Sequence, residues 1–244
     1  MGEAIILANI GNRNIRYIGN NPEIDLIGSE ASFRESTKLL LENFEKESEF
    51  ISAQILPEFF KAINEDINEL VLFGSDSPEG TRNNQDTIFV VRLLERIFKR
   101  DGYSFSITVV PIQIRVVDIN ELMVFYRNFI NTHIENSVQK RFFICDAGGT
   151  TQQKTALKII AEYLIPKENC RIFNVVLDKK KSYPEEIFSF EYRRVIDGHQ
   201  CEALIKQFNF SGALLLQVQN NPGAGGAVID LLRIASDLYS NHAD

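Results

Sequence analysis

Short apolar runs alternate with longer amphipathic stretches along the first three quarters of the chain. Nearly continuous apolar runs of this length are typical of strands that are buried on both faces of a sheet. One later run alternates apolar and small polar residues, as a half-buried strand does. We predict strands at residues 4–10, 69–73, 104–110, 141–145 and 171–177.

Helical patterns fill the intervals between these runs. Their apolar residues recur every three or four positions, as they do on one face of a helix. Helices are predicted at residues 30–44, 50–67 with an interruption at Pro57, 87–99, 118–138 and 151–164. Strands that alternate with helices indicate βαβ units. The sequence therefore predicts an α/β fold with a mostly parallel sheet flanked by helices.

The pattern changes after about residue 182. One more strand is predicted at residues 187–192, and helices follow at residues 196–208, 211–219 and 227–239. The Asn- and Gly-rich stretch at residues 220–226 is a helix breaker. We expect a domain at residues 1–182 and a small C-terminal helical appendage at residues 183–244. The tail ends without a second core, which leaves two alternatives, a piece of a longer protein or a stand-alone sensor.

Three polar loops follow predicted strands, at residues 11–14, 74–86 and 146–154. In parallel sheets, ligands bind beyond the carboxyl ends of the strands, so this topology would bring the three loops to one edge. The third loop is the most informative, because its two glycines allow a tight turn and a close approach to a ligand. Hydroxyls, amides and one lysine then begin a helix, whose free N–H groups suit a phosphate.

Each loop also has a purely structural interpretation. The first is rich in turn residues, although Arg13 could pair with a phosphate. In the second, Asp86 or Asn84 could cap the helix that starts near Thr87, and Arg82 could reach the ligand or a partner subunit. In the third, a cap explains one threonine but not the whole polar run. That loop matches neither a Walker A motif nor G-x-G-x-x-G, so no dinucleotide cofactor is expected.

Composition narrows the classes of function. The net charge of -7 argues against a broad basic surface for duplex DNA or long RNA. No apolar run is as long as a membrane span, and the N-terminus lacks the basic start of a signal peptide. Three cysteines, odd in number and far apart, fit reduced thiols in the cytoplasm. We find no spacing for a metal site and no catalytic triad, and expect no cofactor.

Together, the three loops resemble those of the CARF domain, the Rossmann-like sensor of type III CRISPR systems. Residues 10–14, Ile-Gly-Asn-Arg-Asn, look like the family's first-strand loop, often G-N-R-D, with Asn14 in place of the aspartate. Residues 73–76, with Arg82 and residues 86–87 downstream, are similar to the second loop of some members. Residues 146–154 look like the G-G-T-x-x-(M/K) segment after the fourth strand. The resemblance covers roughly the first 180 residues.

The resemblance implies a Rossmann-like fold and a homodimer that binds a cyclic oligoadenylate, tetra- or hexa-adenylate, across its two-fold axis. It also implies that the helical tail leads to an effector domain, fused or associated. Two alternatives stay open: a ring nuclease that cleaves its own ligand, and an unrelated α/β nucleotide-binding enzyme. The candidate ligand-binding residues are Gly11, Asn12, Arg13, Asn14, Ser75, Asp76, Arg82, Gly148, Gly149, Thr150, Thr151, Gln152, Gln153 and Lys154.

Overall fold

A computed structural model of the chain describes two compact units, Met1–Ile187 and Phe188–Asp244. The residues it describes are 3–24, 26, 32–63, 65–78, 84–134, 140–177 and 182–187, and in the second unit 205–206, 213–214, 230 and 232–236. The described residues of the second unit are helical. The division expected after residue 182 falls at the first residue of a strand that belongs to the sheet, and the first unit runs on to Ile187.

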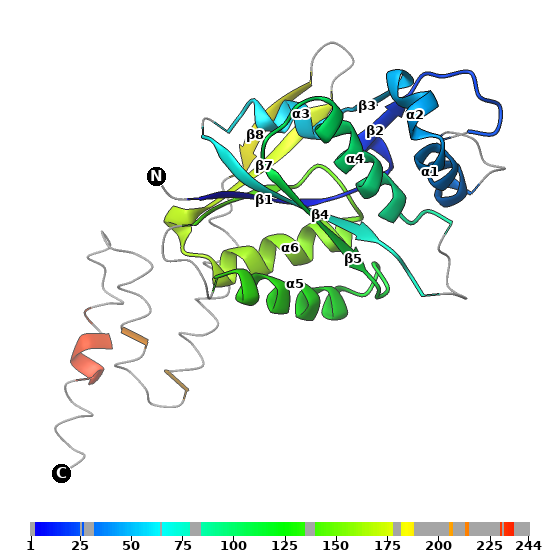
Figure 1. Ribbon diagram of the computed structural model, residues 1–244. Coiled ribbons are helices and arrows are strands. Elements are labelled where there is room, and N and C mark those ends of the chain that lie inside the picture. Colours follow the sequence, from blue (N-terminus) through cyan, green and yellow to red (C-terminus); the bar gives the residue numbers. More distant parts are fainter. Residues whose placement is uncertain are drawn as a thin grey trace. The chain divides into compact units, whose positions relative to one another are not determined.

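One six-stranded sheet organises the first unit (Figure 1). In spatial order, its strands are β5 (Ser106–Ile112), β4 (Ile67–Ser75), β1 (Ala4–Asn9), β6 (Arg141–Cys145), β7 (Cys170–Leu177) and β8 (Ser182–Ile187). The first five are parallel, and β8 pairs antiparallel with β7. This confirms the Rossmann-like α/β fold. All six residues of the central strand β1 are buried, as its continuous apolar sequence predicts.

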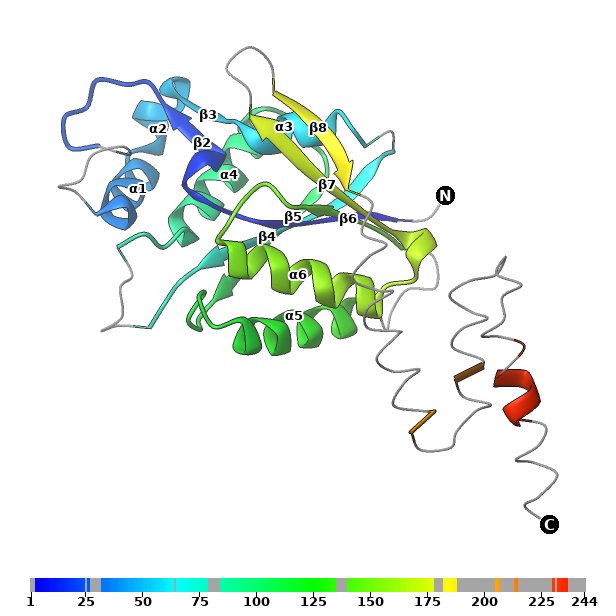
Figure 2. The same ribbon diagram turned by 180° about the vertical axis from the view of Figure 1, so that it is seen from behind.

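Helices cover both faces of the sheet. One face carries α1 (Phe33–Glu42), α3 (Ile55–Phe60) and α4 (Ile88–Arg100), and the other carries α5 (Ile119–Ile134) and α6 (Thr151–Leu164) (Figures 1 and 2). Successive residues of β1 serve opposite layers, because strand side chains alternate between faces. Ile6 and Ala8 enter the α1–α3–α4 core, whereas Ile5 and Leu7 enter the α5–α6 core.

The helix predicted at residues 50–67 is wrong. This region holds the short helix η2 (Ser48–Phe50), the strand β3 (Ile51–Ala53) and α3, before β4 begins at Ile67. β3 pairs antiparallel with β2 (Ile15–Tyr17) in a separate two-stranded sheet. Three-residue strands are too short for an alternation signal, so pairing with a distant segment decided them. The remaining short elements are η1 (Asn12–Asn14), α2 (Phe44–Glu47) and η3 (Lys167–Asn169).

The last strand begins earlier than predicted. β8 starts at Ser182, so the connection from β7 is short enough for an antiparallel return. Arg171 of β7 holds Glu186 of β8 with Nε and Nη2 donating to the two carboxylate oxygens at 2.9 and 2.8 Å. Residues 188–192 lie outside the described residues, as do most residues of the helices predicted in the tail.

Cys145 ends β6 and is buried in the core. Burial raises the pKa of its thiol from the ordinary value of 9.0 to about 12. The neutral thiol therefore favours the folded state below pH 9, and this contribution is lost as the pH rises towards 12.

Near pH 8, the thiolate fraction of Cys145 should be about a thousandfold lower than in the unfolded chain. Mass-spectrometric mapping after iodoacetamide should find Cys145 unlabelled until urea is added, and equal labelling before and after would contradict its burial.

Candidate ligand-binding site

A cavity of about 560 Å³ opens beyond the carboxyl ends of β1, β4 and β6. All three predicted loops contribute to its lining: residues 10–14 from the first, residues 75, 77 and 85–87 from the second, and residues 147–150 from the third. Gln153 of α6 and Val116, between β5 and α5, complete it. Parallel strands thus bring together segments that are far apart in the sequence, as the topology predicts.

The glycine turn touches the end of the central strand. A Cβ added at Gly148 would lie 2.0 Å from the backbone oxygen of Asn9. This distance is too short for any side chain at position 148. Gly149 has a φ of +77°, in the left-handed region that favours glycine. A Cβ at Gly11 would lie 2.9 Å from the backbone nitrogen of Gly149. The β1 and β6 loops therefore pack backbone against backbone, and this contact requires glycine.

Thr150 is the N-cap of α6. Its Oγ1 accepts from the Gln153 N–H at 3.2 Å, and the Gln153 side-chain oxygen accepts from the Thr150 N–H at 2.8 Å, which is a capping box. The Thr150 hydroxyl also donates to the carbonyl of Val116 at 3.0 Å. The helix start is therefore held rigidly at the cavity, with the positive end of its dipole towards the lining.

Two buried amide groups of the lining have unused donors. The side-chain oxygen of Asn14 accepts from the Gly11 N–H at 2.7 Å, and this bond stabilises the first loop. Among the described residues, neither Asn14 Nδ2 nor Gln153 Nε2 has a hydrogen-bond partner, although both residues are at least 98% buried. Buried amides without partners are unfavourable, so these two groups favour a polar occupant nearby.

Paired hydrogen bonds close the base of the second loop. The Ser75 N–H donates to Thr87 Oγ1 at 3.1 Å, and the Thr87 N–H donates to Ser75 Oγ at 3.0 Å. The helix cap expected of Asp86 or Asn84 is wrong, since α4 has Thr87 at its N-cap position and no side-chain cap. The Asp86 carboxylate turns instead towards Arg34 and Ser77, because these donors satisfy it better than a helix end that is already bound to Ser75.

Asn12 and Arg13 form the exposed rim of the first loop. Asn12 Nδ2 donates to Gln85 Oε1 at 2.8 Å, which connects the first loop to the second. Arg13 has no ion-pair partner within the described part of the chain, and its guanidinium is available to an anion.

The structure brings most of the predicted site residues to one cavity. Those that line it are Gly11, Asn12, Arg13, Asn14, Ser75, Gly148, Gly149, Thr150 and Gln153. Asp76, Thr151, Gln152 and Lys154 do not line it. Asp76 is paired with Arg34, and Thr151 is exposed. Arg82 lies outside the described residues.

Seven lining residues were not among the predicted ones: Ile10, Ser77, Gln85, Asp86, Thr87, Val116 and Ala147. Ser77 and Gln85 stand within the predicted second loop, where nothing in the sequence separates lining residues from exposed ones. Val116 follows β5, whose end was not recognised as a fourth contributor because its sequence is apolar. No group of three or more His, Cys, Asp or Glu side chains suited to a metal ion occurs among the described residues.

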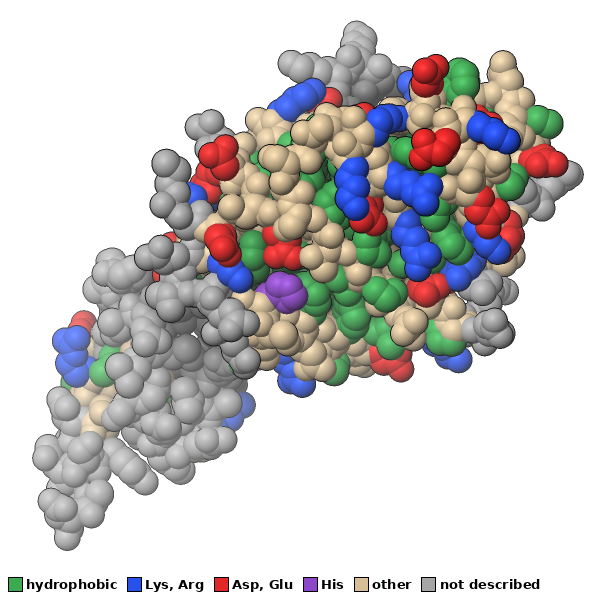
Figure 3. Space-filling model, in the orientation of Figure 1, with side chains coloured by type: hydrophobic (Ala, Val, Ile, Leu, Met, Phe, Trp, Pro, Cys, Tyr) green, Lys and Arg blue, Asp and Glu red, His purple; other side chains and the backbone are tan. Residues whose placement is uncertain are grey.

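A second cavity, of about 440 Å³, lies between α1, α4 and β5. Arg92, Arg96, Val109 and Pro111 contribute to its lining, and none of the three polar loops does. Lys and Arg side chains gather among hydrophobic ones over α4 (Figure 3). Because the three polar loops and the start of α6 line only the first of these two cavities, we take that one as the candidate site. No helix in the described ranges is long and apolar enough to cross a membrane.

Comparisons with known proteins identify the fold. No family model matches the chain, and no curated protein matches it in sequence. Among solved structures, Enterococcus italicus Csm6 bound to cyclic hexa-2'-fluoro-hexa-dAMP is similar, with 15% identity and a TM-score of 0.55. The match covers 99% of this chain and 56% of the Csm6 chain. The chain therefore shares the fold of the matched part of Csm6.

This chain spans a little over half the length of the Csm6 chain that it matches. Can2 from Sulfobacillus thermosulfidooxidans, in complex with cyclic tetra-adenylate, is also similar, with 11% identity and a TM-score of 0.35. That match covers 96% of this chain and 57% of Can2. At 15% identity, the likeness to Csm6 concerns the fold, and the chemistry of the cavity has to be argued from the residues of this chain.

Proposed function

We propose that this chain is a homodimeric sensor that binds a cyclic oligoadenylate, tetra- or hexa-adenylate, in type III CRISPR antiviral defence. The observation that carries the proposal is the cavity in which the glycine turn, the capped start of α6 and the amide-rich first loop converge. Csm6, which shares the fold, is bound to a cyclic hexanucleotide analogue. A cytoplasmic location and an effector domain, fused or associated, belong to the same proposal.

The lining offers partners for the phosphate and for the base of an adenylate. Backbone N–H groups at the start of α6, together with the Arg13 guanidinium, suit the phosphates. The amides of Asn12, Asn14 and Gln153 suit the hydrogen-bonding edge of adenine. The acidic net charge of the chain does not oppose this role, because the required positive groups are local.

The size of the cavity supports a dimer. A volume of about 560 Å³ is typical of a pocket for a single drug-sized molecule. A ring of four or six adenylates is much larger, so one copy of the chain would hold only part of it. Two copies related by a two-fold axis present identical lining residues, which matches a ligand built from identical units.

Titration calorimetry with cyclic tetra-adenylate, cyclic hexa-adenylate, linear oligoadenylate and AMP tests the proposal, together with light scattering for the mass of the complex. We expect micromolar or tighter binding of one ring size, with one ring per two chains. Absence of binding to any ring at micromolar protein would refute the sensor role. Preference for AMP would favour the unrelated nucleotide-binding enzyme.

Cleavage of the bound ring is a second candidate, favoured by the anion-stabilising groups at the start of α6. Among the described residues, the lining contains no histidine, and its Asp86 carboxylate is engaged by Arg34 and Ser77. A cleavage reaction would therefore depend on holding the ribose 2'-hydroxyl in line with its phosphate. Chromatography after long incubation distinguishes the two roles, because a pure sensor returns the ring intact.

A further inference from the structure

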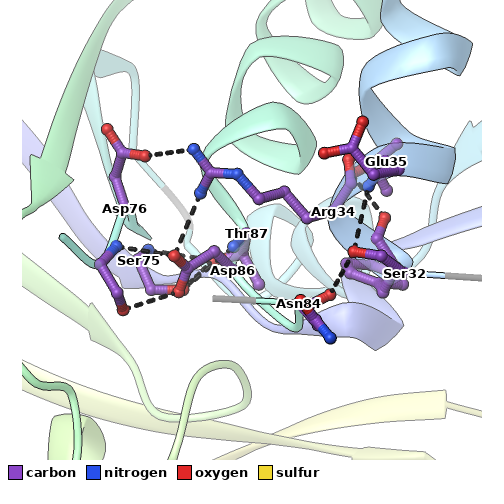
Figure 4. A network of polar contacts seen from close by, with 11 residues as sticks. Ser32, Arg34, Glu35, Ser75, Asp76, Asn84, Asp86 and Thr87 are labelled. Atoms are coloured by element: carbon purple, nitrogen blue, oxygen red, sulfur yellow. Dashed lines mark hydrogen bonds and ion pairs between the residues drawn. The ribbon is translucent and has the colours of Figure 1, made fainter. Parts of the chain in front are cut away.

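Arg34 stands in the first turn of α1 and does not line the cavity. Its guanidinium nevertheless joins the two ends of the second loop (Figure 4). Nη2 donates to Asp76 Oδ1 at 2.7 Å, just after β4, and Nη1 donates to Asp86 Oδ2 at 3.0 Å, just before α4. One side chain thus holds both sides of the loop between β4 and α4.

Asp86 connects Arg34 to the wall of the cavity. Its side chain is 5% exposed, and its oxygens also accept from the Ser77 N–H at 2.6 Å and the Ser77 hydroxyl at 3.0 Å. Ser77 and Asp86 both line the cavity. The backbone N–H of Arg34 also donates to the carbonyl of Asn84 at 2.9 Å. The start of α1 therefore sets the position of the wall through side-chain and main-chain contacts.

We propose that Arg34 is a positioning residue of the ligand cavity, which holds Ser77 and Asp86 in place and neutralises the Asp86 carboxylate. The effect on ligand affinity rests on the proposed function, whereas the effect on the wall does not. Without the guanidinium, Asp86 would be an uncompensated buried charge in the wall of a site for an anion. Lysine cannot substitute, because a single ammonium lacks the planar fork that spans two carboxylates.

The overall fold does not depend on this interaction. Ser75 and Thr87 close the base of the loop with their own hydrogen bonds, so β4 and α4 keep their ends without Arg34. The guanidinium lies 5.2 Å from the ring centroid of Phe89, a second contact that keeps it oriented. Its loss should therefore change the positions of Ser77 and Asp86 while the core stays folded.

The test compares Arg34→Lys and Arg34→Gln with Arg92→Gln as the matched control. Arg92 lies 5.9 Å from the same Phe89 ring but has no ion pair within the described residues. Hydrogen exchange on the ligand-free protein should show the Ser77 amide exchanging about tenfold faster in both Arg34 variants, with the Thr87 and Leu7 amides unchanged. Unchanged Ser77 exchange in Arg34→Lys would overturn the inference, whether or not a ring binds.

Affinity provides the second readout. For the ring size that the wild type binds, the Kd should rise about ten- to a hundredfold in both Arg34 variants and less than about twofold in Arg92→Gln. Adding Asp86→Asn to Arg34→Gln should recover part of the affinity, because it removes the uncompensated charge. Additive losses would contradict the charge argument. If Arg34→Gln fails to fold, Arg34→Lys alone decides, and a Ser77 amide that still exchanges at the wild-type rate in it would overturn the inference.

Discussion

Replacing Gly148 with alanine is expected to destabilise the protein by about 3 kcal/mol and to abolish ligand binding. The added Cβ would lie 2.0 Å from the carbonyl oxygen of Asn9 and 2.9 Å from the side-chain oxygen of Asn14. Asn9 cannot move away, because it ends the buried central strand and its side-chain oxygen accepts from the buried Tyr126 hydroxyl at 2.5 Å. Urea denaturation and calorimetry measure the two effects.

Gly102→Ala is the control for adding a methyl group at a glycine outside the cavity, although Gly148 does not share the positive φ of Gly102. Gly102 has a φ of +80°, and a Cβ there would meet nothing within 4 Å. It therefore isolates the cost of a left-handed backbone conformation, about 1 kcal/mol, without a clash and away from the cavity. We expect unchanged ligand affinity in Gly102→Ala. A Gly148→Ala protein as stable as Gly102→Ala would show that the β1 and β6 loops are not packed as described.

Replacing Thr150 with valine is expected to cost about 2 kcal/mol of stability and at least about tenfold in ligand affinity. Valine keeps the shape of threonine but removes its hydroxyl. The Gln153 N–H then loses its acceptor, and the carbonyl of Val116 loses its donor. Affinity should fall because the start of α6, whose N–H groups we propose for the phosphate, is no longer held at the cavity.

Two variants serve as controls for the Thr150→Val prediction. Thr150→Ser keeps the hydroxyl and should stay within about 0.5 kcal/mol of the wild type. Thr151→Val changes the exposed neighbouring residue, which has no side-chain hydrogen bond within the described structure, and should also change stability by less than about 0.5 kcal/mol. Equal losses in Thr150→Val and Thr151→Val would mean that the cap does not control the helix start.

The elements that could be predicted from the sequence are those with strong local signals. β1, β4 and β6 are buried on both faces, and their continuous apolar runs identify them. α6 has a capping box at its start, and its first residue was predicted correctly. β2 and β3 could not be predicted in this way, because three residues carry no periodicity and each strand exists only through the other.

The candidate site also contains features that could be predicted from the sequence and features that could not. Glycines, hydroxyls and amides after predicted strands identify the first and third loops, because their roles depend on local backbone chemistry. The role of Asp86 could not be predicted, since a carboxylate next to a helix start looks like a cap. Its true partners are Ser77 and Arg34, and only the folded loop brings them within reach.

The sequence by itself determined the parallel α/β sheet, the three loops at its carboxyl edge and the glycine turn beside a helix start. Burial patterns and turn residues are local properties, and they remain readable without a structure. Only the tertiary structure decided that Arg34 supports the cavity wall. Its contacts with Asp76 and Asp86 join residues 42 and 52 positions apart, so they depend on how α1 packs against α4 and on no pattern within either segment.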